Sequence, residues 1–179
     1  MELLKQLYGI SSKSGMEERM KSFVLDCVSD VELSVETDEI GNLFITKGEA
    51  ELYPCIAAHL DEIHSPCERT VIIEGNRIFT VDRLWNHVGC GADDKNGLWV
   101  IINLLHSEPI LKVALFVQEE RVGDNAGCRG ARACDLSFFN DVKFVIECDR
   151  KGSSDVVSIG KDELVLCHPD FIPQGILRR

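Results

Sequence analysis

Three short, mostly apolar runs constrain this sequence most strongly. They cover residues 54–58, 111–117 and 142–146. The first run has no polar alternation, which is typical of a strand covered on both faces. We read the other two as further core strands. The sequence therefore predicts an α/β fold, with a mixed, mostly parallel sheet sandwiched between helices.

Each of these runs is followed at once by acidic or histidine side chains. His59 and Asp61 follow the first run, Glu119 and Glu120 the second, and Asp149 comes soon after the third. In open α/β sheets, functional sites form at the carboxyl ends of the strands. One such placement could be chance, but three together indicate a shared site.

A fourth acidic segment is the stretch 91–97, with the sequence GADDKNG. It holds Asp93 and Asp94 directly before the apolar residues 98–105, so it predicts a loop that enters a buried helix at about 94–106. Adjacent carboxylates in a buried position are unfavourable without a partner, and a cation would supply one. For this pair alone, a helix cap with solvated neighbours is the alternative. Imidazole and carboxylate ligands together suit zinc or a similar divalent ion.

The remaining elements are predicted from hydrophobic periodicity and turn residues. Ser14 and Glu17 resemble a capping box before a helix. The predicted elements are two helices within 1–28, strands at 31–35 and 42–46, a hairpin within 68–81, a short helix at 130–133 and two strands within 155–167.

Composition narrows the function classes. The 179 residues are enough for one domain with a real core, and we predict a single domain over 1–179. The net charge is −11, which argues against a basic nucleic-acid-binding face. No apolar run reaches the roughly 20 residues that span a bilayer, and the first residues do not resemble a signal peptide. We therefore expect neither nucleic-acid nor membrane binding.

The chain has eight cysteines and no Cys-x-x-Cys pair. A zinc finger or a thioredoxin-type site is therefore unsupported. Several cysteines lie within apolar runs, which is typical of reduced, buried thiols. We expect a cytoplasmic protein on this ground.

Residues 50–160 resemble the co-catalytic zinc exopeptidases, which include tripeptide aminopeptidases, glutamate carboxypeptidase-like enzymes and related deacylases. The resemblance rests on four motifs taken together in order and spacing. They are AHLD at 58–61, GADDK at 91–95, QEE at 118–120 with glycines at 123 and 127, and ECD at 147–149.

The resemblance implies a role for each motif residue. One metal ion would be held from the strand ends, a second ion would share a bridging carboxylate, and a free carboxylate would act as general base toward the attacking water. It also implies a cis peptide bond between Asp93 and Asp94. The implied residues are His59 and Asp149 for the first ion, Asp93 as the bridge, Glu120 for the second ion, Glu119 as the base and Asp61 to orient His59.

The sequence departs from the family pattern in one respect. The family has a fifth ligand, a histidine well downstream of the position of Asp149. Only His168 follows Asp149 here, and it lies too close and in a different context. We also expect no counterpart of the larger enzymes' lid or dimerisation domain in this sequence. The expected cofactor is one or two Zn²⁺ ions, with Co²⁺ or Mn²⁺ as substitutes.

The resemblance implies a zinc-dependent exopeptidase-type hydrolase, an aminopeptidase on short peptides that is weakly active or inactive without the fifth ligand. The alternatives are a hydrolase of N-acyl amino acids from the same superfamily and a non-catalytic metal- or peptide-binding module. Another subunit of a homo-oligomer could also supply the ligand. Its candidates are His64, His87, His106 and His168.

Overall fold

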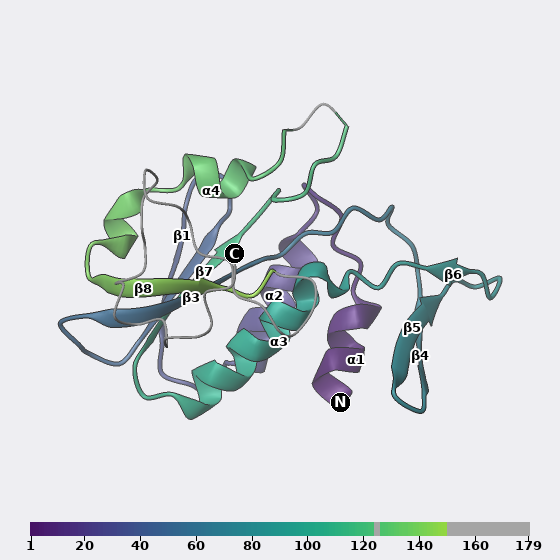
Figure 1. Cartoon of the computed structure of the whole chain (residues 1–179), viewed down its shortest axis with the longest axis horizontal. Helices are drawn as coiled ribbons and strands as arrows, with labels where there is room; N and C mark the ends of the chain where they lie inside the picture. The colour runs from purple at the N-terminus through teal and green to yellow at the C-terminus, as the bar shows by residue number, and fades with distance from the viewer. Residues whose placement is uncertain (124–125, 150–179) are drawn as a thin grey trace, which may run out of the picture.

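The computed structural model describes residues 1–123 and 126–149, and Figure 1 shows their arrangement. The main sheet has five strands in the order β1-β2-β7-β3-β8. The strands predicted within 155–167 lie outside the described residues, as does His168. The five strands are β1 (Ser34–Thr37), β2 (Leu43–Lys47), β3 (Tyr53–His59), β7 (Leu111–Phe116) and β8 (Val142–Glu147).

The sheet is mixed. β7 and β8 lie on either side of β3, and both run parallel to it. β2 pairs antiparallel with both β7 and β1. The two parallel pairings join the three strands that were predicted to deliver the functional residues. Their carboxyl ends therefore meet at one edge of the sheet.

Helices cover both faces of this sheet (Figure 1). One face packs on α1 (Glu2–Gly9), α2 (Glu18–Cys27) and α3 (Ala92–Ser107). The other face packs on the segment with α4 (Arg129–Ala133) and the short 3-10 helix η1 (Leu136–Phe139). The predicted α/β sandwich is confirmed.

The larger core lies between the sheet and α3. The helix buries the face formed by Leu98, Ile101, Ile102 and Leu105, because these residues recur at helical spacing. This packing fixes α3 against the sheet. Its first turn, with the two aspartates, is thereby held at the functional edge.

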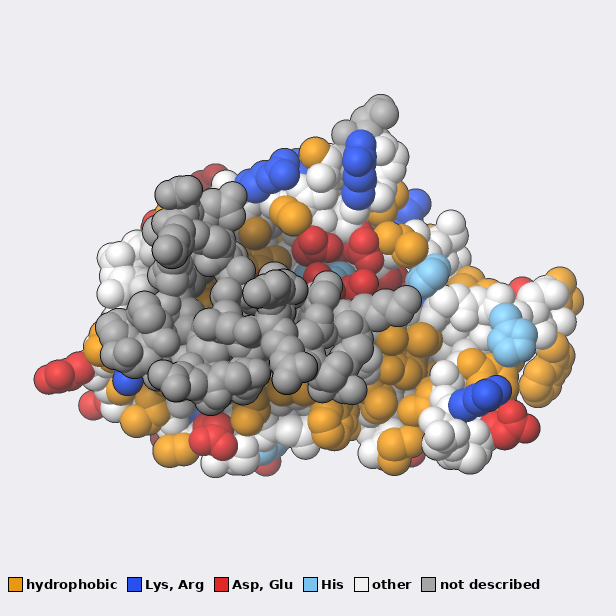
Figure 2. All heavy atoms as spheres, viewed as in Figure 1, with side chains coloured by type: hydrophobic (Ala, Val, Ile, Leu, Met, Phe, Trp, Pro, Cys, Tyr) orange, Lys and Arg blue, Asp and Glu red, His pale blue; other side chains and the backbone are white. Residues whose placement is uncertain are grey.

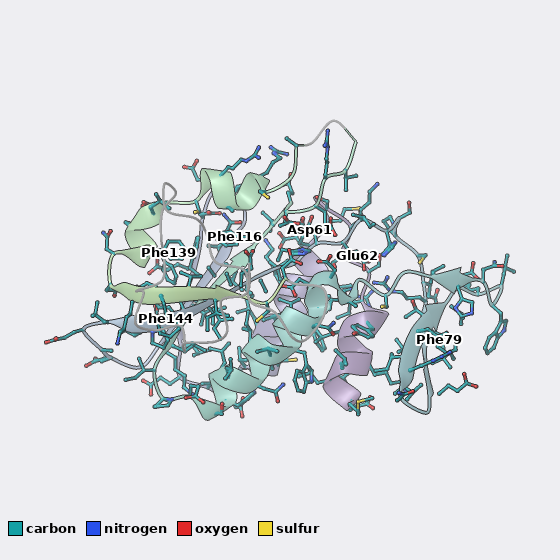
Figure 3. The ribbon with its side chains drawn as sticks, in the orientation of Figure 1. Asp61, Glu62, Phe79, Phe116, Phe139 and Phe144 are labelled. Carbon is teal, nitrogen blue, oxygen red and sulfur yellow. The ribbon has the colours of Figure 1, made fainter. Side chains whose placement is uncertain are left out.

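Aromatic side chains dominate the smaller core on the other face. The Phe44 ring lies 4.8 Å from that of Phe138 and 6.4 Å from that of Phe116, measured between centroids. Phe138 and Phe139 meet edge to face at 5.2 Å. Figure 3 labels Phe116 and Phe139 in this layer.

A second, three-stranded antiparallel sheet lies to the side of the main sheet, beyond α1 (Figure 1). The predicted hairpin within 68–81 is confirmed, with its turn at Gly75 in the left-handed region. Its strands are β4 (Thr70–Glu74), β5 (Arg77–Val81) and β6 (His87–Val88). Among the described residues, no helix is both long and apolar enough to span a membrane.

Two local expectations were wrong. β1 begins at Ser34 rather than at residue 31, and its residues are exposed, so their alternation reports no buried face. Glu17 does not form a capping box with Ser14. Its Oε1 accepts hydrogen bonds from the amides of Gly15 (2.7 Å) and Gln118 (3.1 Å), so the carboxylate is used to hold the end of β7.

Candidate metal centre

The predicted ligands come together at the carboxyl edge of the parallel strands. His59 is the last residue of β3, Glu119 and Glu120 follow β7, and Asp149 follows β8. The first turn of α3 adds Asp93 to the same edge. Figure 2 shows acidic side chains gathered around histidine atoms on this face.

Two groups of three residues could each hold a metal ion, and His59 belongs to both. Within each group, the ligand atoms lie within 4.8 Å of one another. The first group joins His59, Glu119 and Asp149, and the second joins His59, Asp93 and Glu120. His59 Nε2 is 2.9 Å from Asp93 Oδ1 and 3.9 Å from Glu119 Oε2. Each of the four predicted metal ligands thus belongs to a group that contains His59, but Asp93 and Asp149, predicted to share one ion, fall in different groups. The structure also adds Glu119 to the residues that could reach an ion.

Asp61 has more partners than the sequence indicated. Its Oδ1 is 3.4 Å from His59 Nδ1, which is long for a hydrogen bond, so this contact is mainly one of charge. The same carboxylate accepts hydrogen bonds from the amides of Glu119 (2.9 Å) and Glu120 (3.1 Å). Asp61 therefore fixes the backbone of two residues of the site, as well as facing His59.

The aspartate pair at the start of α3 is separated by a cis peptide bond, as the resemblance implied. The two side chains diverge: that of Asp93 is 68% exposed, whereas Asp94 is 2% exposed. Asp94 Oδ1 accepts a hydrogen bond from the amide of Gly97 at 3.0 Å. A Cβ on Gly97 would lie 2.4 Å from Asp94 Oδ2, so this close approach requires glycine.

Carboxylates are concentrated at this edge of the sheet, and the pKa values show that ionising several of them is unfavourable. Burial, together with neighbouring carboxylates, raises the pKa of Asp94 to about 7, of Glu120 to about 7 and of Asp149 to about 6. Burial lowers the pKa of His59, but the neighbouring carboxylates of Asp61, Asp93 and Asp94 outweigh it and raise that pKa to about 10. We call the following residues the acidic cluster: His59, Asp93, Asp94, Glu119, Glu120 and Asp149.

The acidic cluster fits a divalent cation. Its donors are one imidazole and several carboxylates, a set that suits zinc and is compatible with cobalt or manganese. Among the described residues, His59 Nδ1 and Asp94 Oδ2 are buried polar atoms without a hydrogen-bond partner. A positive ion would stabilise the ionised carboxylates, which burial and mutual repulsion destabilise.

The other histidines of the described chain do not join either ligand group. The His64 ring lies against Gly89, where a Cβ would be 1.9 Å from Nε2. His87 is exposed in β6, with its ring 5.0 Å from that of Phe79. His106 is also exposed, and its Nε2 is 3.0 Å from the carbonyl oxygen of Cys27.

Several supporting residues gave no signal in the sequence. Buried Asn42 accepts a hydrogen bond from the amide of Val117 (3.0 Å) and donates one to the Gly130 carbonyl (2.9 Å). The Cys128 thiol donates to Glu119 Oε1 at 3.2 Å. The Asn42 contacts join segments far apart in the chain, so local spacing could not reveal them. As expected, the seven described cysteines are free thiols, but the expected burial is wrong, because only Cys55 is buried and the other six are half-buried.

No protein-family model and no curated protein sequence matches the chain significantly. Solved structures do match. A tripeptidase from Staphylococcus aureus and the aminopeptidase PepT from Bacillus cereus each have a TM-score of 0.68 at 20% sequence identity. Each match covers 84% of this chain and 43% of the other.

A third match is the TET1 peptidase of Pyrococcus horikoshii, which assembles into a tetrahedron or a large octahedral shell. Its TM-score is 0.56 at 16% identity, covering 83% of this chain and 68% of that one. The chain thus spans less than half the length of the first two structures. It has the α/β fold of tripeptidase and aminopeptidase structures, which is the fold that the resemblance to zinc exopeptidases implied.

Proposed function

We propose that this chain binds zinc at the acidic cluster and is a zinc-dependent exopeptidase-type hydrolase, an aminopeptidase on short peptides. The observation that supports this most is the convergence of carboxylates from two strand ends and one helix start on the buried His59, which ends a third strand. The likeness to peptidase structures supports the same proposal through the fold.

In this proposal the acidic cluster provides ligands for two ions. His59, Asp93 and Asp149 hold the first ion, which gives three protein ligands and leaves one position open, as in catalytic zinc sites. Glu120, whose carboxylate lies within 4.8 Å of that of Asp93, holds a second ion with it. Two carboxylates are few ligands for zinc, so the second position is weak.

Glu119 acts as the general base. A base must keep one oxygen free for the proton, and Cys128 contacts only Oε1 of Glu119. Oε2 faces His59 at 3.9 Å, so it is directed toward the ligand groups. The ligand geometry also admits Glu119 as a direct ligand beside His59 and Asp149, and experiment must separate the two roles.

Zinc, when bound, would polarise the scissile carbonyl and make water more acidic. The chain's own residues would handle the proton. Glu119 would take it from the attacking water and give it to the leaving amine. Asp61 would hold Glu119 in place through the amide hydrogen bond and would keep His59 oriented.

A non-catalytic metal- or peptide-binding module is the second candidate. It is favoured by the ligand count, because His59 is the one histidine in the ligand groups of the described chain. In a homo-oligomer, a partner subunit could add a further histidine and restore the second position. The oligomeric TET1 peptidase offers a precedent for assembly in this fold.

The test combines zinc content with turnover. Purified protein would be analysed for zinc and assayed on di- and tripeptides and on N-acyl amino acids. Zinc-dependent release of the N-terminal residue supports the aminopeptidase, and cleavage of acyl amino acids alone supports the related deacylase. Zinc binding without turnover on either set supports the binding module, and failure to bind zinc contradicts all three.

A further inference from the structure

A second buried charged group adjoins the acidic cluster along the chain, because Glu62 is three residues from His59 and Lys95 is two residues from Asp93. It consists of Glu62, Arg69 and Lys95, which are 0%, 8% and 1% exposed. We call these three residues the ionic cluster. Figure 3 labels Glu62 beside Asp61. Neither the proposed ligand set nor the proton transfer uses these residues.

Lys95 is fully engaged. Its Nζ donates to the carbonyl of Ile10 (2.6 Å), to Glu62 Oε2 (2.8 Å) and to the carbonyl of Cys90 (3.0 Å). An ammonium group has three donors, so each of them is used. The side chain therefore joins the start of α3 to the N-terminal segment, to the loop before α3 and to Glu62.

The carboxylate of Glu62 is equally constrained. Its Oε1 accepts from Arg69 (2.7 Å) and from the amide of Ser12 (3.1 Å). Burial raises its pKa, but the hydrogen bond from Arg69 and the charge of Lys95 outweigh it and hold that pKa below its ordinary value. Glu62 is thus an ionised carboxylate with two cations beside it.

The ionic cluster contacts the chain on both sides of Asp93, the proposed bridging ligand. Glu62 Oε2 bonds Lys95, and it also lies so close to Gly91 that a Cβ there would be 2.0 Å away. Gly91 and Lys95 bracket Asp93, each two residues from it. Glu62 itself is three residues after His59, so one carboxylate joins the end of β3 to the start of α3.

We propose that Lys95, bound to Glu62, is a positioning residue for metal binding: it holds Asp93 at ligand distance from His59. This inference rests on the proposed zinc site. It predicts that loss of the Lys95 ammonium weakens zinc binding through Asp93, although Lys95 touches no ligand group.

The charge effect of Lys95 has the opposite sign, which makes the proposal testable. Lys95 is a cation near a site that would bind a cation, so removing its charge should by itself strengthen zinc binding. A loss of affinity in Lys95→Met can therefore only come from displaced ligands or a disturbed fold.

The experiment is a titration of zinc alone into metal-free wild type and Lys95→Met, read with a competing chelator. Lys112→Met is the matched control, because Lys112 is also buried and paired, with Asp141 and the Phe138 carbonyl, at the opposite end of β7. We expect zinc affinity to fall about tenfold or more in Lys95→Met, as for other groups that orient ligands, and to stay unchanged in Lys112→Met.

A double-mutant cycle with Asp93→Ala separates positioning from loss of fold. Lys95→Met should have no further effect on zinc affinity once Asp93 is absent, because its effect passes through that ligand. If Lys95→Met does not fold, Glu62→Gln, which keeps the size of the side chain, takes its place in the same cycle.

Three outcomes would overturn the inference. They are unchanged or stronger zinc binding in Lys95→Met, an equal loss in Lys112→Met, and an equal loss in the Asp93→Ala background. In each of these the wild type still binds zinc, so the proposed metal site survives. A wild type that binds no zinc overturns the proposed function and this inference together.

Discussion

The ionic cluster and the acidic cluster draw residues from the same two segments, the end of β3 and the start of α3, yet their charges are arranged in opposite ways. In the ionic cluster, one carboxylate lies between two cations, and its pKa is lowered. In the acidic cluster, five carboxylates surround one histidine, and the pKa values of Asp94, Glu120 and Asp149 are raised.

The difference separates a structural arrangement from a functional one. A buried charge is tolerated when it is paired and hydrogen-bonded, which describes Glu62. Carboxylates whose pKa values are raised toward neutrality, in a group that shares a histidine, are typical of functional sites. The five carboxylates of the acidic cluster thus have His59 as their one positive partner within it, whereas the one carboxylate of the ionic cluster has two.

The largest expected effect separates the base from the ligands within the acidic cluster. Glu119→Gln should lower kcat by about 10²–10⁴-fold, because the amide cannot take the proton. Its zinc affinity should stay close to that of the wild type, as measured by chelator competition. Glu120→Ala is the comparison, since it removes a proposed ligand. An equal loss of zinc affinity in the two variants would make Glu119 a ligand.

The next effect concerns the stability of the ionic cluster. Glu62→Ala should lower the free energy of unfolding by about 3–5 kcal/mol, because it leaves two buried cations without their carboxylate. Urea unfolding of the metal-free protein measures this. The control is Glu68→Ala, since Glu68 pairs with Arg83 at the surface and such pairs contribute little. Similar values for the two variants would contradict the view that the ionic cluster stabilises the fold.

The smallest expected effect is an increase in stability rather than a loss. Asp94→Asn should stabilise the metal-free protein at pH 8, because the wild-type carboxyl, with its pKa raised to about 7, is ionised there in a buried, negatively charged place. Asn can still accept the Gly97 hydrogen bond. Each kcal/mol gained should raise Tm by about 2–4 °C. A lower Tm, as expected for Asp141→Asn at its ion pair with Lys112, would show that Asp94 is not under repulsion.

The sequence predicted the residues of the candidate metal site better than the buried residues that hold them in place. The ends of β3, β7 and β8 could be located because apolar runs mark core strands, and parallel strand ends meet at one edge. Glu62 could not be assigned in this way. It follows His59 by three residues, but its partners Arg69 and Lys95 come from two other segments, and only the assembled fold brings them within reach.

The same limit applies to Glu17 and Asn42. Each binds the backbone near the end of β7 across a long sequence separation. Local patterns carry periodicity and turn chemistry, whereas such contacts depend on the assembled fold. The capping box predicted for Ser14 and Glu17 was wrong for the same reason. In the assembled fold, the Glu17 carboxylate accepts a hydrogen bond from the distant amide of Gln118.

The central claim is that the acidic cluster is a metal site, and a zinc titration of the metal-free chain tests it most directly. The account predicts one tightly bound zinc ion per chain, lost in His59→Ala, with an increase in Tm on binding. It also predicts a second, much weaker ion at the Asp93 and Glu120 side. Failure to take up zinc, with Tm unchanged at saturating metal, would contradict the account.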